Sequence, residues 1–237
     1  MNSSVFPFLS NFVFLLLLFI QIPSSLSNDD LFTACSKKFE CGGISAGFPF
    51  LGADRPPACG IHELELRCNE KNITTMKINQ VAYRVLKINR EDEILRIARE
   101  DYWVGLCPPQ YMNTFNPQIF EPVDGYKFYT FTYGCTDAST TIFGPKAFTC
   151  KEGENGPGEL CNGSVTVPVP IKDSPPVWNT VALEEQLKNG FEVRWKVDSE
   201  ACRECNRSSG VCGFNKVTSQ TTCYYPGMHS PPEIISS

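Results

Sequence analysis

Hydrophobic and polar residues alternate along parts of this chain in the period-two pattern of half-buried β-strands. The clearest run is residues 191–197, where Phe191, Val193, Trp195 and Val197 share one face and charged residues occupy the other. We therefore expect this run to form a strand whose aromatic and aliphatic face lies in a hydrophobic core.

Several other short runs rich in β-branched and aromatic residues also predict strands. These runs are residues 76–78, 83–88, 93–98 and 126–133. Polar residues between the first three favour turns, so these three are predicted to form an antiparallel meander.

One segment has the features of a helix, residues 181–188 (VALEEQLK). Asn179 or Thr180 can cap its start, and Asn189-Gly190 is expected to end it because glycine readily adopts the left-handed conformation. The predicted fold class is therefore mainly β, with one short helix in the second half of the chain.

An apolar run at residues 12–22 precedes all of these elements. It has the length of a signal-peptide core and is shorter than the ~20 apolar residues of a membrane-spanning helix. The small residues around Ser25 and Ser27 favour cleavage after Ser27, so residues 1–27 are predicted to be a signal peptide and the protein to be secreted. An uncleaved anchor is the alternative, because no Lys or Arg precedes the apolar run.

The chain contains twelve cysteines, all downstream of the apolar run. Such a density is typical of disulfides in an oxidising compartment, and the even number permits complete pairing. The pairing partners are left open by the sequence, and a four-thiolate zinc site at residues 202, 205, 212 and 223 is the alternative for the last group. The predicted disulfide cysteines are Cys35, Cys41, Cys59, Cys68, Cys107, Cys135, Cys150, Cys161, Cys202, Cys205, Cys212 and Cys223.

The cysteines fall into two groups, which predict two small disulfide-stapled β modules. The expected modules are residues 28–107 and 126–226, joined by a linker rich in Pro, Asn and Gln at 108–125 and followed by a flexible tail at 227–237. No second long apolar segment follows the leader, so no membrane span is expected after cleavage.

The net charge of −5 argues against a nucleic-acid partner, which normally requires a basic surface. Asn72, Asn162 and Asn206 each begin an Asn-x-Ser/Thr sequence, so all three are candidate glycosylation sites on the surface of an exported protein.

The sequence contains no convincing catalytic or metal-binding set. His62 and His229 are the only histidines, and pairs such as Glu63/Glu65 are expected to be solvated surface acids. No glycine-rich nucleotide loop, His-Arg-Asp or Asp-Phe-Gly kinase motif is present. We therefore expect no enzyme activity, no cofactor and no metal; a secreted hydrolase is the alternative.

The first cysteine group is interleaved with cationic and aromatic residues. Arginine and lysine pair with carboxylates, and aromatic rings stack on sugar rings, so together they could hold an acidic polysaccharide. The alternative is that the cations are ordinary surface residues and the aromatics belong to the core. The candidate ligand-binding residues are Lys37, Lys38, Phe48, Phe50, Arg55, Arg67, Tyr83 and Arg84.

The cysteine-rich pattern at 35–68 resembles the galacturonan-binding module of plant wall-associated receptor kinases and their leaf-rust-resistance-locus relatives. The matching residues are Cys35, Cys41, Gly42, Gly47, Phe48, Pro49, Phe50, Cys59, Gly60, Leu66 and Cys68, followed by Tyr83-Arg-Val. The second half is similar to the C-terminal module of the same receptors. That similarity is carried by Tyr133-Gly-Cys135, the segment 190–195, Cys202, Cys205, Ser209, Gly210, Cys212 and Gly213.

The resemblance implies a non-catalytic ectodomain that binds pectic polysaccharide, galacturonan, in the cell wall. In the family, this region is normally joined through a membrane helix to a cytoplasmic kinase. The sequence departs from the family pattern at Phe48, where relatives often have tyrosine, and after Cys223, where they commonly end with Cys-x-Cys. The alternative function is that of a protein- or peptide-binding ectodomain of a truncated receptor-like serine/threonine kinase in defence signalling, with other receptor ectodomains as partners.

Overall fold

The computed structural model describes residues 28–52, 54–103, 118–133, 149–150, 163–171, 180–197, 199–227 and 233–234. Strands dominate these residues, as predicted. The helices are α2 (Asn28–Ser36), α3 (Thr180–Asn189) and α4 (Ser199–Arg207), with 3-10 turns η1 (Pro57–Cys59) and η2 (Asp101–Trp103). Within the described part of the chain, no helix is long and apolar enough to cross a membrane.

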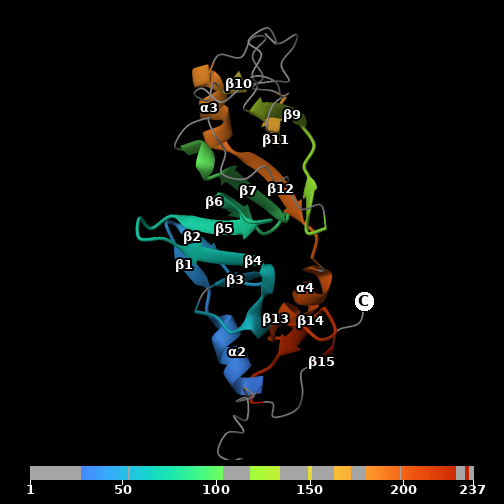
Figure 1. The fold of residues 1–237 in the computed structure, drawn as a ribbon. Helices are drawn as coiled ribbons and strands as arrows, with labels where there is room; N and C mark the ends of the chain where they lie inside the picture. The colour runs from blue at the N-terminus through green and yellow to red at the C-terminus, as the bar shows by residue number, and fades with distance from the viewer. Residues whose placement is uncertain are drawn as a thin grey trace, which may run out of the picture.

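The central element is a seven-stranded sheet with the strand order β3-β4-β5-β6-β7-β12-β8 (Figure 1). Only β3 and β4 are parallel; every other neighbouring pair is antiparallel. The strands are β3 (Phe50–Gly52), β4 (Ile61–Cys68), β5 (Thr74–Ile78), β6 (Val81–Asn89), β7 (Ile94–Arg99), β8 (Phe120–Pro122) and β12 (Phe191–Trp195). The predicted meander is therefore confirmed as β5, β6 and β7.

Strand β12 reaches this sheet from the far end of the sequence. It lies between β7 and β8, with Phe191 opposite Ile97 and Trp195 opposite Phe120. The two segments predicted as separate modules thus contribute strands to one sheet. The proposed boundary at 108–125 stays a prediction, because residues 104–117 lie outside the described residues.

The core lies against one face of the central sheet. The predicted alternation in 191–197 is confirmed, since Phe191, Val193 and Trp195 are buried and Val197 is partly buried against the same core. Trp195 meets Phe50 edge-to-face, with 5.0 Å between ring centroids. Aromatic pairs of this geometry add to the stabilisation from burial alone. The edge strand β3 is therefore joined through its core face to β12.

Helix α3 confirms the helix predicted at 181–188. Gly190 follows its last residue with a φ of +72°, and its backbone N–H donates to the Gln186 carbonyl at 3.2 Å. A Cβ at this position would overlap the Ile97 carbonyl oxygen. Glycine therefore both ends the helix and lets the chain pass close to β7. Asn179, the other predicted cap, lies outside the described residues.

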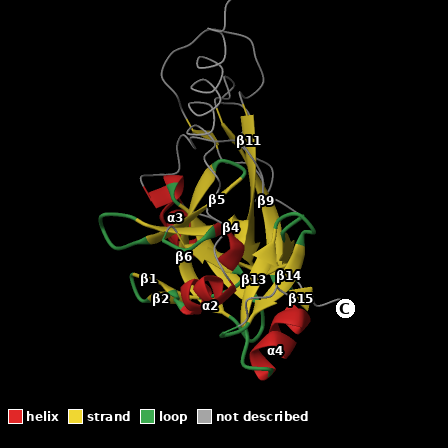
Figure 2. Ribbon diagram, turned by 90° about the horizontal axis from the view of Figure 1, so that it is seen from below, coloured by secondary structure: helices red, strands yellow, loops and turns green. Residues whose placement is uncertain are grey.

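Two of the three smaller sheets extend the molecule at the ends of the central sheet, and the third, formed by β1 and β2, lies beside it (Figure 1). Figure 1 places β9 to β11 and α3 at one end, and α2, α4 and β13 to β15 at the other; Figure 2 views this second end from below. The remaining strands are β1 (Phe39–Cys41), β2 (Ile44–Ala46), β9 (Tyr126–Tyr133), β10 (Thr149–Cys150), β11 (Gly163–Pro170), β13 (Val211–Asn215), β14 (Gln220–Tyr224) and β15 (Glu233–Ile234). Strand β9 confirms the strand predicted at 126–133.

Four disulfides staple the described residues. They join Cys35 to Cys59, Cys41 to Cys68, Cys202 to Cys212 and Cys205 to Cys223. The last two link α4 to β13 and β14, and they leave no thiolates for the alternative four-thiolate zinc site. The other predicted disulfide cysteines stay predictions, because Cys107, Cys135 and Cys161 lie outside the described residues and the Cys150 side chain is not described.

Removing the Cys205–Cys223 disulfide, by changing both residues to alanine, is expected to lower the free energy of unfolding by about 3 kcal/mol. The bridge closes a segment with a sequence separation of 18 residues, so its loss enlarges the conformational freedom of the unfolded chain. Urea denaturation measures the change. Lys216→Ala, on the exposed turn between β13 and β14, is the control and should change stability by less than about 0.5 kcal/mol. An unchanged midpoint in the cysteine variant would contradict the prediction.

Candidate functional site

The structure separates the predicted ligand-binding residues into buried and exposed groups. Phe50 and Tyr83 lie in the core, with 0% and 3% of their surface exposed. Burial raises the pKa of the Tyr83 hydroxyl to about 12, against the opposing effect of the nearby Arg99 charge. The structure therefore gives these two residues a packing role in place of the predicted sugar contact.

Arg55 is also buried, and its two terminal guanidinium nitrogens bond to the backbone, whereas its Nε has no hydrogen-bond partner among the described residues. It donates to the carbonyls of Phe50 at 2.6 Å, Cys35 at 3.1 Å and Cys59 at 3.2 Å. Burial, and then the positive charge of Arg90, lowers the pKa of Arg55. Arg55 is therefore structural, but it places a positive charge just below the surface that carries Arg90.

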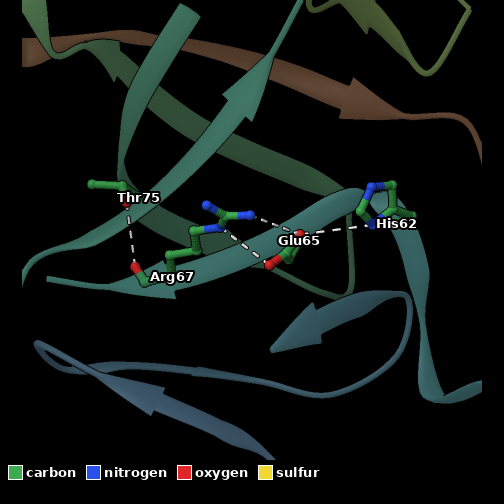
Figure 3. A network of polar contacts seen from close by, with 4 residues as sticks. All are labelled: His62, Glu65, Arg67 and Thr75. Atoms are coloured by element: carbon green, nitrogen blue, oxygen red, sulfur yellow. Dashed lines mark hydrogen bonds and ion pairs between the residues drawn. The ribbon is translucent and has the colours of Figure 1, made fainter. Parts of the chain in front are cut away.

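Arg67 and Arg84 lie on the outer face of the central sheet, where carboxylates already accompany them. Figure 3 shows Arg67 paired with Glu65 at 3.1 Å, with His62 on the other side of the same carboxylate at 3.7 Å. Arg84 lies 3.6 Å from the Glu100 carboxylate and stacks over the Trp103 ring at 4.0 Å. These pairings weaken the case for either arginine as the main contact of an anionic ligand.

Phe48, in contrast, lines two adjoining cavities between the central sheet and the C-terminal disulfide unit, and Lys38 lines the smaller one. The cavities measure about 450 Å³ and about 260 Å³, and Phe48, Arg90, Cys202 and Asn206 line both of them. We call this feature the Phe48 groove. Its larger cavity is lined by Phe48, Pro49, Arg90, Glu91, Glu93, Trp195, Val197, Ser199, Cys202, Arg203 and Asn206, and its smaller one by Cys35, Ser36, Lys38, Gly47, Phe48, Arg90, Cys202, Asn206, Val211 and Cys212.

The floor of the Phe48 groove is formed by buried aromatic residues. Phe48, between β2 and β3, packs against the sulfurs of the two disulfides in the C-terminal unit. Trp195, at the end of β12, contributes the other aromatic ring, and its backbone N–H donates to the Glu93 carbonyl at 3.2 Å. The floor thus depends on contacts between distant parts of the chain.

The turn between β6 and β7 places Arg90 on the rim of the groove. The Asn89 side-chain oxygen accepts hydrogen bonds from the backbone N–H groups of Glu91 at 3.1 Å and Asp92 at 3.3 Å. An asparagine that bonds to the backbone two residues ahead fixes a tight turn locally. Asn89 therefore stabilises the turn from which the exposed Arg90 side chain extends.

The charges around the groove are sorted by position. Within the described part of the chain, neither Lys38 nor Arg90 has a carboxylate within ion-pair distance, although Arg90 lies 3.5 Å from the Phe48 carbonyl oxygen. Glu91 and Glu93 line the larger cavity, where Glu93 accepts a hydrogen bond from the Ser199 hydroxyl. The smaller cavity takes two cations, Lys38 and Arg90, and no carboxylate from the described residues, so this end of the groove is positive, which suits a ligand that carries carboxylates.

The remaining predicted surface residues are Lys37 and the three candidate glycosylation sites, and one of them, Asn206, lies at the groove. Lys37 is exposed just beyond α2 and lines neither cavity. Asn72 is exposed, and its side-chain oxygen accepts a hydrogen bond from the Gly42 N–H at 3.1 Å. Asn206 lines the groove, whereas Asn162 lies outside the described residues.

Sequence reasoning missed Arg90, Arg203 and Trp195 as groove residues. Arg90 is a single cation in a polar turn, and Arg203 lies on a helix that was not predicted, where it pairs with Glu200. The alternation of 191–197 placed Trp195 on an inward face but gave no indication of its neighbours.

Comparison with known proteins gives two family matches. A family described as wall-associated receptor kinase galacturonan-binding matches residues 35–99. A second, described as wall-associated receptor kinase C-terminal, matches residues 134–228. Neither description is of a catalytic domain. The groove takes residues from both matched segments: Lys38, Phe48 and Arg90 from the first, and Trp195 and Asn206 from the second.

The chain is also similar to Arabidopsis thaliana proteins named leaf rust 10 disease-resistance locus receptor-like protein kinase-like. Form 2.4 is 36% identical over 206 residues, which cover 83% of this chain and 33% of that protein. Form 2.8 is 35% identical over 219 residues, covering 89% of this chain and 24% of that protein. This chain therefore spans about a quarter to a third of the length of these relatives. No solved structure matches it.

Proposed function

Because this chain belongs to the wall-associated and leaf-rust-resistance-locus receptor-like kinase family, as a counterpart of its extracellular region, we propose that it binds acidic pectic polysaccharide outside the cell. The proposed ligand is galacturonan, and the proposed mode is binding without catalysis. The observation that carries the proposal is the positive end of the Phe48 groove, where Lys38 and Arg90 lack carboxylate partners among the described residues.

The groove suits such a ligand in size and chemistry. Ligand pockets commonly measure about 300–1,000 Å³ and combine an apolar lining with a few convergent polar groups. The larger cavity, about 450 Å³, falls in this range. In the proposed complex, the Arg90 guanidinium and Lys38 ammonium donate to uronate carboxylates, and the apolar faces of the sugar rings lie over Phe48.

A protein or peptide partner is the second candidate, because the relatives are named as receptor-like protein kinases. The same unpaired cations could bind an acidic peptide. Retention on a purified receptor ectodomain, combined with no retention on any pectic polymer, would favour this candidate over the galacturonan ligand.

The secreted protein is expected to be retained on de-esterified polygalacturonate at low salt and released as salt is raised. Binding through partly exposed charges weakens with ionic strength, because the Debye length falls to about 8 Å at 0.15 M. Fully methyl-esterified pectin, which lacks the carboxylate charges, is the control and should retain little. Each arm is run with and without calcium. Absence of retention on polygalacturonate in both conditions would reject the proposed function.

A further inference from the structure

We infer that Asn206 carries an N-linked glycan whose first sugars lie in the Phe48 groove, so that glycosylated molecules exclude the acidic polysaccharide. The effect on binding rests on the proposed function, whereas the location of the glycan does not. The inference joins two independent features of Asn206: its place in an acceptor sequence and its place on the groove wall.

The first feature is chemical. Asn206-Arg207-Ser208 is an acceptor sequence for N-glycosylation, and the four disulfides of the described residues are typical of proteins that pass through the secretory pathway. Asn206 is exposed and occupies the last turn of α4. The acceptor side chain is therefore on the surface rather than inside the C-terminal unit.

The second feature is the position of the nitrogen to which a glycan would be attached. The side-chain nitrogen of Asn206, to which the first sugar is attached, lies 3.7 Å from the Cys202 sulfur. Cys202 lines both cavities of the groove, as Asn206 itself does. The protein-linked sugar therefore begins at the groove wall, next to the Cys202–Cys212 disulfide that joins α4 to β13.

The groove offers room and partners for these sugars. The larger cavity, about 450 Å³, is lined by Asn206 together with Arg203, Glu91 and Arg90. The hydroxyl and acetamide groups of N-acetylglucosamine can hydrogen-bond to such charged side chains, while its ring face covers the apolar floor. A neutral sugar can therefore contact both the charged side chains and the apolar floor of the groove.

The consequence is steric exclusion at the binding site. A glycan seated beside Arg90 and over Phe48 occupies the space that the uronate rings would use. The groove is then blocked in glycosylated molecules and open to the polysaccharide in unglycosylated ones. Asn72 provides an internal control, because it is also an exposed acceptor but lines neither cavity.

The first test uses protein secreted from plant cells and separated on polygalacturonate. Mass spectrometry of the glycopeptides is expected to find Asn206 glycan enriched in the unbound fraction by on the order of tenfold over the bound fraction. The occupancy of Asn72 should be the same in both fractions. Asn206→Gln is expected to move the whole sample to the bound fraction, whereas Asn72→Gln should leave the distribution unchanged.

A second test does not depend on pectin binding. Phenylglyoxal labelling, read residue by residue, is expected to be weaker at Arg90 and Arg203 in the glycosylated protein than in Asn206→Gln, and equal at Arg67. Absence of glycan at Asn206, or equal labelling of Arg90 in both proteins, would overturn the inference. Equal occupancy in bound and unbound fractions would overturn the exclusion and leave the proposed function intact. Shielding of Arg90 without any binding by Asn206→Gln would reject the proposed function and keep the glycan in the groove.

Discussion

Arg90→Glu is expected to weaken binding to polygalacturonate by about 10–100-fold. Hydrogen bonds to charged groups contribute about 1.5–3 kcal/mol each, and a factor of ten in affinity corresponds to 1.4 kcal/mol. The substitution removes an arginine that lines both cavities of the Phe48 groove and replaces it with a charge that repels the ligand. Lys38 and the buried Arg55 remain, so residual binding at low salt is expected.

Arg67→Glu is the matched control for this experiment. It makes the same charge change on an exposed arginine of the galacturonan-binding segment, but its side chain is on the outer face of the sheet beside Glu65 (Figure 3). Isothermal titration with oligogalacturonides should give nearly the parental affinity for this variant. Equal losses in the two variants would mean that overall charge, rather than the groove, controls binding.

The stability of Arg90→Glu is expected to remain close to that of the parent. Arg90 lies near the buried Arg55, and its positive charge contributes to the lowered pKa of that group. Replacing it with a carboxylate removes a like-charge repulsion, so the binding loss cannot be attributed to unfolding. Urea denaturation alongside the titration checks this point.

The strands could be predicted where the information is local. Residues 191–197 alternate strictly because one face is buried, and the period of two is visible in the sequence itself. The helix at 181–188 could be predicted because glycine ends it through its own backbone conformation. In each case, nearby residues are sufficient to determine the element.

The sequence did not reveal helix α4 or the placement of β12. The buried face of α4 is formed by Ala201, Cys202 and Cys205, whose inward position follows from disulfides to β13 and β14 rather than from an apolar repeat. Alternation likewise predicts which face of β12 is buried, but not that β7 and β8 are its neighbours. Such pairings depend on contacts between residues far apart in the sequence.

The sequence predicted only part of the candidate site, for a related reason. Residue type suggested Phe50 and Arg55 as ligand contacts, yet the same properties make an aromatic ring a core residue and a guanidinium a bridge between backbone carbonyls. The choice between these roles depends on burial, which is set by the whole fold. Lys38 and Phe48 were predicted because they are a cation and an aromatic residue within the first cysteine group, whereas Arg90 joins them only in three dimensions.

Trp195→Ala is expected to lower the free energy of unfolding by about 3–5 kcal/mol, the usual cost of removing a large aromatic side chain from a core. Trp195 has 3% of its surface exposed and packs edge-to-face on Phe50, so its loss leaves a cavity between β12 and β3. Because β12 is the strand that brings the C-terminal segment into the central sheet, the variant should also loosen the floor of the Phe48 groove.

Trp195→Phe separates the two consequences. A phenylalanine keeps an aromatic ring beside Phe50 and should recover more than half of the lost stability, since most of the buried apolar area is retained. Urea denaturation gives the stability of both variants, and titration with oligogalacturonides below the unfolding transition gives their affinities. If Trp195 holds the groove, affinity should follow stability, with the alanine variant weakest and the phenylalanine variant intermediate. A fully stable Trp195→Ala would show that β12 is not joined to the core as described, whereas a destabilised variant with parental affinity would place the ligand away from this groove.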